Sequence, residues 1–97
     1  MVKVGVLVRM EAQPGKAEEV ATFLQGALSL VQEEPGTVTW YAIRIGPSEF
    51  GIFDTFEDDA GRQAHLSGKV AEGLMARASE LFVAPPDIRT VDVLAAK

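Results

Sequence analysis

Cysteine is absent from this chain, and so are the short motifs that commonly hold cofactors. Without cysteine, the protein has no disulfide, no thiolate nucleophile, no cysteine-type zinc site and no iron–sulfur cluster. The chain also lacks the glycine spacing of a phosphate-binding loop, the dinucleotide-binding fingerprint and the serine nucleophile elbow. We therefore expect no metal and no redox cofactor to be held by a recognisable motif.

Positive charge is scarce as well. The sequence has 9 lysines and arginines against 14 aspartates and glutamates, a formal net charge of −5. This charge repels a nucleic-acid backbone, and no basic cluster is long enough to reverse it locally. The apolar N-terminal run, residues 1–9, is too short to cross a bilayer and lacks a signal-peptide cleavage site. We expect neither nucleic acid nor a membrane as a partner, and we expect a cytoplasmic location.

Apolar residues, by contrast, are abundant. They make up 47% of the sequence, which is high for a chain that we expect to form one domain over residues 1–97. A domain of this size buries only about 60–70% of its surface when it folds alone. The excess indicates that a second copy or a bound apolar ligand completes the core, although a buried helix would also account for it.

Two kinds of hydrophobic periodicity divide the chain. Alternation with a period of two, rich in β-branched and aromatic residues, predicts strands over residues 2–10, 37–45, 50–56 and 88–95. Apolar residues at helical spacing predict helices over residues 16–34 and 60–66, and a further helix from a Ser67 cap to Leu81. Consecutive acids, residues 57–59, suit a helix start better than a metal site, because neighbouring carboxylates do not converge on one point.

The order strand–helix–strand–strand–helix–strand, with the second helical part split, predicts an α+β fold of the ferredoxin-like split βαβ type. Right-handed crossovers place the helices on one face of a four-stranded antiparallel sheet. The opposite face is left bare although the strands carry apolar residues on both faces. We therefore expect a homodimer in which a second subunit covers it.

Two ionisable residues stand out as candidates for chemistry. His65, the only histidine, is predicted within a helix, where it could act as a general base or remain a half-exposed helix residue bonded to a neighbour. Asp54 lies in an apolar strand on the face of Phe50 and Ile52. A carboxylate there either pairs with an arginine or has its pKa raised, as catalytic bases often do. His65 is expected within reach of Asp54.

Trp40 in the second predicted strand could form one wall of a pocket for a flat substrate, and Arg44, on the same face of that strand, could bind a phenolate or carboxylate. Trp40 could equally be core or dimer contact, and Arg44 a partner in a surface salt bridge. Phe23 widens the apolar stripe of the first helix beyond what one sheet face needs. We include it among the candidate ligand contacts.

Several segments together resemble the antibiotic biosynthesis monooxygenase family of dimeric α+β barrels. They are Pro14-Gly15-Lys16 before the first helix, Glu34-Pro35-Gly36-Thr37 before the second strand, the strand of residues 50–56, and Ala64-His65-Leu66 in the following helix. The similarity covers nearly the whole chain. No single motif is specific, but their order and spacing together are telling.

The resemblance implies a cofactor-free oxygenation of phenols or quinols with O₂, in a cleft between sheet and helices. His65 would match the family's helical histidine, and Trp40 with Phe53 and Phe56 would form the aromatic cradle for a small aromatic or apolar ligand. Two departures matter: the chain contains no asparagine, and Phe56 stands where haem-degrading members have tryptophan. The alternative is a non-catalytic dimeric barrel with a binding or regulatory role, which a filled core in place of the cleft would favour.

Overall fold

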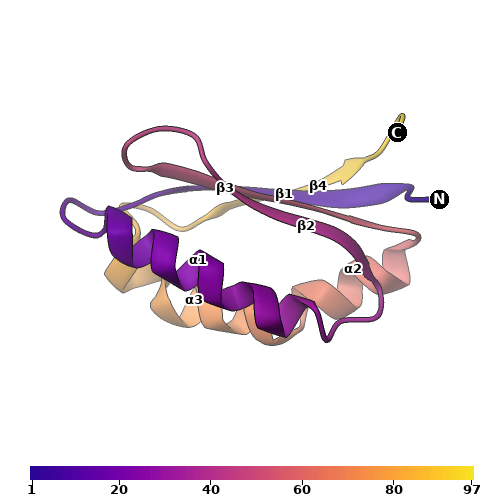
Figure 1. Ribbon diagram of the computed structural model, residues 1–97, viewed down its shortest axis with the longest axis horizontal. Coiled ribbons are helices and arrows are strands. Elements are labelled where there is room, and N and C mark those ends of the chain that lie inside the picture. Colours follow the sequence, from indigo (N-terminus) through magenta and orange to yellow (C-terminus); the bar gives the residue numbers. More distant parts are fainter.

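The computed structural model describes residues 1–97 as a four-stranded sheet with three helices. Along the chain the elements are β1 (Val4–Glu11), α1 (Ala17–Val31), β2 (Thr37–Arg44), β3 (Glu49–Phe56), α2 (Asp59–Leu66), α3 (Lys69–Leu81) and β4 (Asp87–Asp92). The strands are antiparallel in the order β2-β3-β1-β4. All three helices lie on one side of the sheet (Figure 1). The predicted α+β, ferredoxin-like fold is confirmed.

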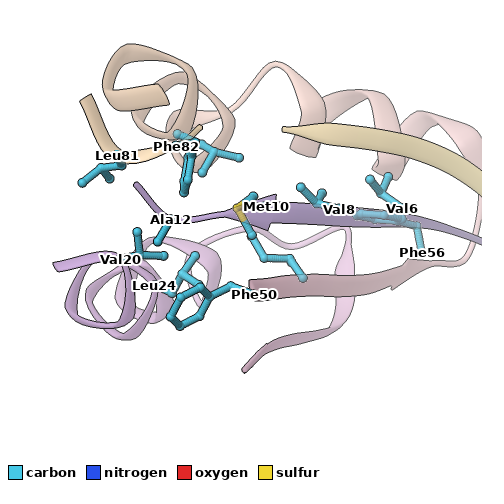
Figure 2. Packing of buried hydrophobic residues seen from close by; sticks show 12 residues of the cluster. Val6, Val8, Met10, Ala12, Val20, Leu24, Phe50, Phe56, Leu81 and Phe82 are labelled. Carbon is cyan, nitrogen blue, oxygen red and sulfur yellow. The ribbon is translucent and has the colours of Figure 1, made fainter. Parts of the chain in front are cut away.

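The strand register explains which side chains meet the helices. Val6, Val8 and Met10 of β1 pair with Asp54, Ile52 and Phe50 of β3, so these alternate residues share the helix-facing side. Figure 2 labels ten apolar side chains of this layer, which come from β1 and the residue after it, from β3 and α1, and from α3 and the residue after it. Their close packing fills the space between the sheet and the α1–α3 pair.

Some helices and strands begin or end at other residues than predicted, because residues predicted as helical belong to turns. The first helix ends at Val31, so Gln32, Glu33 and Glu34 belong to the turn before β2 and not to the helix. Ser67 is not the N-cap of α3, because its hydroxyl bonds back to the Gln63 carbonyl at 2.9 Å. Gly68 takes the N-cap position, without a side-chain cap. Elsewhere, β1 begins and β4 ends a few residues inside the predicted ranges.

The acidic start of α2 is confirmed as a cap. Asp58 Oδ1 accepts a hydrogen bond from the Gly61 backbone nitrogen at 3.0 Å, which satisfies one of the free N–H groups of the first turn. Asp59 pairs instead with Arg62 at 2.8 Å. The acids therefore fix the helix start and leave no cluster directed at one point.

The face of the sheet away from the helices is largely apolar and uncovered within the chain. Tyr41, Ile43 and Ile45 on the β2 side are 58%, 47% and 46% exposed. A side chain at Gly5 would meet Val91 and Phe53, which shows that these two residues pack over β1 on the same face. We call this surface, made of Leu7, Tyr41, Ile43, Ile45, Phe53 and Val91, the open face.

None of the three helices combines the length and the apolar composition that a membrane span requires.

Candidate functional site

His65 sits near the end of α2 and contacts a carboxylate on each side of its ring. Its Nδ1 lies 2.6 Å from Glu34 Oε1, and its Nε2 lies 3.0 Å from Asp54 Oδ2. The imidazole is buried, with a side chain that is 7% exposed. The three side chains come from the turn after α1, from α2 and from β3, and they form the Glu34–His65–Asp54 chain.

Asp54 is the most buried residue of the Glu34–His65–Asp54 chain. It is 1% exposed and lies on the helix-facing side of β3, between its register partners Val6 and Trp40. The contact to His65 has the length of an ion pair, but it is not aligned as a hydrogen bond, and neither Asp54 oxygen receives a second donor. A buried carboxylate without a partner is costly, and His65 is the polar side chain that contacts Asp54.

Glu34 is the member nearest to solvent, with a side chain that is 19% exposed. The Thr37 hydroxyl donates a hydrogen bond of 2.8 Å to the same Oε1 that contacts His65. Two glycines let the turn approach α2 this closely. A Cβ on Gly36 would lie 3.0 Å from the Gly61 Cα, and one on Gly61 would lie 3.0 Å from the Gly36 carbonyl oxygen.

The surroundings of His65 act on its pKa in two directions. Burial lowers the pKa, because the charged imidazolium loses its hydration. The carboxylates of Asp54 and Glu34 more than reverse this effect, so the net result is a pKa raised above the ordinary value of 6.5. In the imidazolium form, both ring nitrogens are protonated and each lies beside a carboxylate, which leaves no free nitrogen to act as a base.

A cleft of about 370 Å³ opens at this end of the molecule, beside the Glu34–His65–Asp54 chain. Its walls are the end of α1, the turn before β2, and the α2–α3 junction. Among the residues that line it are Leu30, Glu33, Glu34, His65, Gly68 and Lys69. Of the two carboxylates in the Glu34–His65–Asp54 chain, only that of Glu34 lines the cleft.

The cleft is not where the family resemblance placed it. The space between sheet and helices holds a cluster of 12 buried hydrophobic residues, including Phe50 at 2% and Phe56 at 0% exposure. The cleft lies instead at the edge of the helical layer, and no residue of β3 lines it. Asp54 acts on it only through His65.

The other predicted site residues are scattered. Phe56 is buried with its ring centroid 5.5 Å from that of His65, and half-buried Trp40 packs against the core with its indole N–H unpaired. Arg44 is exposed, pairs with Glu18 at 3.0 Å and lies 4.9 Å over the Phe50 ring. Two more residues lie apart from the cleft: Phe53 faces the open side of the sheet, and Phe23 lines a separate hollow between α1 and α3.

The sequence predicts a role for His65 and Asp54 but none for Glu34. Glu34 lies in the predicted first helix, and the Glu34-Pro35-Gly36-Thr37 segment contributes only to the family resemblance. No group of three or more histidine or acidic side chains is arranged to hold a metal ion.

A comparison with solved structures gives a close relative and a wider group of similar folds. The NE2512 protein of unknown function from Nitrosomonas europaea is 52% identical over 100% of this chain and 94% of its own, with a TM-score of 0.98. A structure named antibiotic biosynthesis monooxygenase is 13% identical over 95% of this chain and 99% of its own, with a TM-score of 0.81. A Caulobacter crescentus protein that carries this name provisionally is 18% identical over 97% and 92%, with a TM-score of 0.82.

The two distant likenesses show a shared fold, which agrees with the predicted family resemblance, and they say nothing of the reaction of this chain. No model of a known protein family and no curated protein matches the sequence. Which chemistry the cleft performs must therefore be argued from its own residues.

Proposed function

We propose that this chain, which belongs to one family with the NE2512 protein and has the fold of the antibiotic biosynthesis monooxygenases, oxidises a phenol or quinol-type aromatic compound with O₂. The observation that carries the proposal is the Glu34–His65–Asp54 chain, which begins in the core and ends at a cleft. The polar contacts in the Glu34–His65–Asp54 chain hold Glu34 in a fixed position. An isolated surface carboxylate has no such contacts.

Glu34 is the proposed base. His65 lies between two carboxylates, and its ring together with the Thr37 hydroxyl fixes the orientation of Glu34. A substrate proton passes to the Glu34 carboxylate, which is partly exposed to the cleft. Asp54 contacts the opposite nitrogen of the imidazole and so holds the ring in place against Glu34. His65 and Asp54 are thus positioning residues that act through Glu34.

Proton removal makes the ring system electron-rich enough to reduce O₂ directly. For an anthrone-type substrate, a ring CH₂ becomes a C=O group: the carbon loses two hydrogens and gains one oxygen atom of O₂. The other oxygen atom leaves with those two hydrogens as water, so O₂ takes up the four electrons that the carbon gives. The protein contributes the base and an environment that stabilises the intermediate anion.

Two features of the cleft suit that anion. Lys69 lines the cleft, and its ammonium group can approach a phenolate oxygen. Gly68, also in the cleft wall, begins α3 without a side-chain cap, so the first backbone N–H groups of that helix remain available to negative charge. Both would favour the deprotonated substrate over the neutral one.

The test is O₂ uptake with anthrone- or hydroquinone-type compounds in metal-free buffer. The variant Glu34→Gln should lower the rate by about 10²–10⁴-fold, the usual contribution of a general base. Glu33→Gln is the matched control, because Glu33 lines the same cleft and carries the same charge but has no contact with His65. Turnover by Glu34→Gln at the parental rate, in a variant that remains folded, would remove Glu34 from this role.

One observation favours a second function. Buried hydrophobic residues fill the space between sheet and helices, where the family resemblance implied a cleft, and the cleft that is present is open to solvent. A non-catalytic barrel that binds a small apolar ligand would fit such a structure. Ligand-induced thermal stabilisation without O₂ uptake in the same assays would support it over the oxygenase.

We also propose that the working unit is a homodimer formed through the open face. The support for this is the exposure of Tyr41, Ile43 and Ile45, together with the partly buried Phe53 beside them. A stable interface should bury well over about 1,000 Å² in total. The cleft lies on the helical side of the sheet, so dimerisation through the open face would leave it accessible.

A further inference from the structure

A second hollow adjoins the cleft. It measures about 290 Å³ and lies between α1 and α3, where Phe23, Ala27 and Val70 form part of its walls. Leu30 and Lys69 line both this hollow and the cleft, so the two spaces meet at these side chains. We call the second space the α1–α3 trough.

The trough differs from the cleft in its chemistry. Apart from Lys69 and Thr22 it is lined by apolar side chains and by two glycines, whereas the cleft carries the carboxylates of Glu33 and Glu34. Lys69 lies where the two spaces meet, and its aliphatic stem can line the trough while its ammonium group stays at the rim. One end of the combined space is thus polar and ionisable, and the other is apolar.

No side chain of the protein fills the trough. Gly26 of α1 has nothing within 4 Å of an added Cβ, and an added Cβ on Gly73 of α3 would only touch the Phe23 ring at 3.8 Å. Leu30 at the junction is 36% exposed. Apolar walls without an apolar filling are the condition under which an apolar group of a ligand gains most from burial.

A charged cluster lies beside Phe23 at the far end of the trough. The Arg77 guanidinium lies 5.8 Å over the ring of Phe23 and is paired with Glu19 and Glu80. From Leu30 to Thr22 the trough follows about eight residues of α1, or roughly 12 Å at the helical rise per residue. An apolar chain that extends beyond Phe23 would therefore meet this charged cluster.

We propose, on the premise of the oxygenase function above, that the substrate is a phenol or quinol with a linear apolar tail. Its ring and hydroxyl lie in the cleft beside Glu34, and its tail lies in the α1–α3 trough as far as Phe23. Continuity of the two spaces at Leu30 and Lys69 supports one ligand that occupies both. A compact polycyclic ring without a tail would leave the trough empty.

The experiment measures the binding of hydroquinone, butylhydroquinone and octylhydroquinone to the full chain by calorimetry in oxygen-free buffer, below the concentrations at which the compounds form micelles. Each methylene group buried in the trough should tighten binding by about fourfold. The expected order of affinity is octyl, then butyl, then unsubstituted hydroquinone. Tails that extend past Phe23 should add nothing more.

Gly73→Leu fills the trough and should abolish the gain from the tail while leaving the affinity for unsubstituted hydroquinone unchanged. Ala76→Leu is the matched control, because Ala76 is exposed on the same helix and lines neither space. The inference is overturned if affinity does not rise with tail length, or if Gly73→Leu keeps the whole gain, as it would if the tails bound to the open face.

Absence of oxygen separates this inference from the proposed reaction. If tail-dependent binding is found but air brings no O₂ uptake, the oxygenase function fails and the assignment of the ligand stands. If unsubstituted quinols are oxidised at the same rate as tailed ones and bind equally well, the trough assignment fails and the oxygenase function stands.

Discussion

The side chains on the two faces of β3 differ in how they are covered. Toward the helices, Phe50, Ile52, Asp54 and Phe56 are all buried at 3% exposure or less. Toward the open face, the same strand presents Phe53 beside the exposed side chains of β2, with nothing in the chain above them. The helices account for this difference, because all of them lie on one side (Figure 1).

This difference in burial determines where the loss of a polar contact lowers the stability of the fold most. On the open side, the Thr39 and Thr55 hydroxyls bond to each other at 2.6 Å and the charged contacts are exposed pairs such as Arg89–Asp87. Exposed pairs contribute little, because water screens them. On the helical side, Asp54 has only His65 within reach, so a single side chain supports its buried charge.

The largest expected effect is therefore that of His65→Ala. The substitution leaves the carboxylates of Asp54 and Glu34 without a counter-charge, and we expect a loss of about 3–5 kcal/mol in the free energy of unfolding. Denaturant titration measures it. A half-exposed histidine, as the sequence allowed, would have cost less than about 1 kcal/mol.

Arg89→Ala is the control for this loss, because it breaks an exposed ion pair at the edge of the open side. The unfolding midpoint of that variant should stay close to the parental value. Equal midpoints for both variants would contradict the view that burial makes the His65 contacts matter.

A second, smaller effect tests the open face. Ile43→Glu places a charge among exposed apolar side chains, and it should convert the proposed dimer to a monomer because a buried unpaired charge opposes association. Light scattering at micromolar concentration should give twice the chain mass for the parent and the chain mass for the variant. Val83→Glu, at an exposed position after α3, should leave the dimer intact. A monomeric parent would disprove the assembly.

The smallest effect is a dependence of stability on pH. The folded state holds the His65 proton more tightly than the unfolded state, because its pKa is raised above 6.5 by the two carboxylates. This contribution is complete below pH 6.5 and is lost as the pH rises through the folded-state pKa. The melting temperature should fall over that range, and His65→Asn should remove this part of the slope. A melting temperature that rises there would reverse the assignment.

The fold could be predicted because it depends on patterns within short segments. The alternation of Val4, Val6, Val8 and Met10 and the turn at Pro35-Gly36 fix strand and helix types locally. The approach of His65 to Asp54 also followed, because β3 is central and α2 comes directly after it. The surroundings of Trp40 and Phe53 depend on which side of the sheet the helices cover. This is set by packing across the whole chain and not by a short segment.

Glu34 could not be found in the same way. Its proposed role rests on a contact between residues 31 apart in the sequence, His65 and Glu34, and on the end of α1 at Val31, three residues before the end that the Pro35-Gly36 pair predicts. Helical periodicity carries no information on such an end, because capping and tertiary contacts decide it. The location of the cleft was missed for the same reason.

The contact between Gly36 and Gly61 gives this pair of residues a value for recognising related proteins. Even a Cβ at either position would lie 3.0 Å from backbone atoms of the other residue, so the turn and α2 would have to shift apart slightly. A chain that keeps the two segments this close is therefore expected to keep both glycines. The combination Glu-x-Gly before the second strand and Gly-x-x-x-His in the following helix is thus a four-residue signature for this geometry, which can be sought in chains whose overall identity is too low to align.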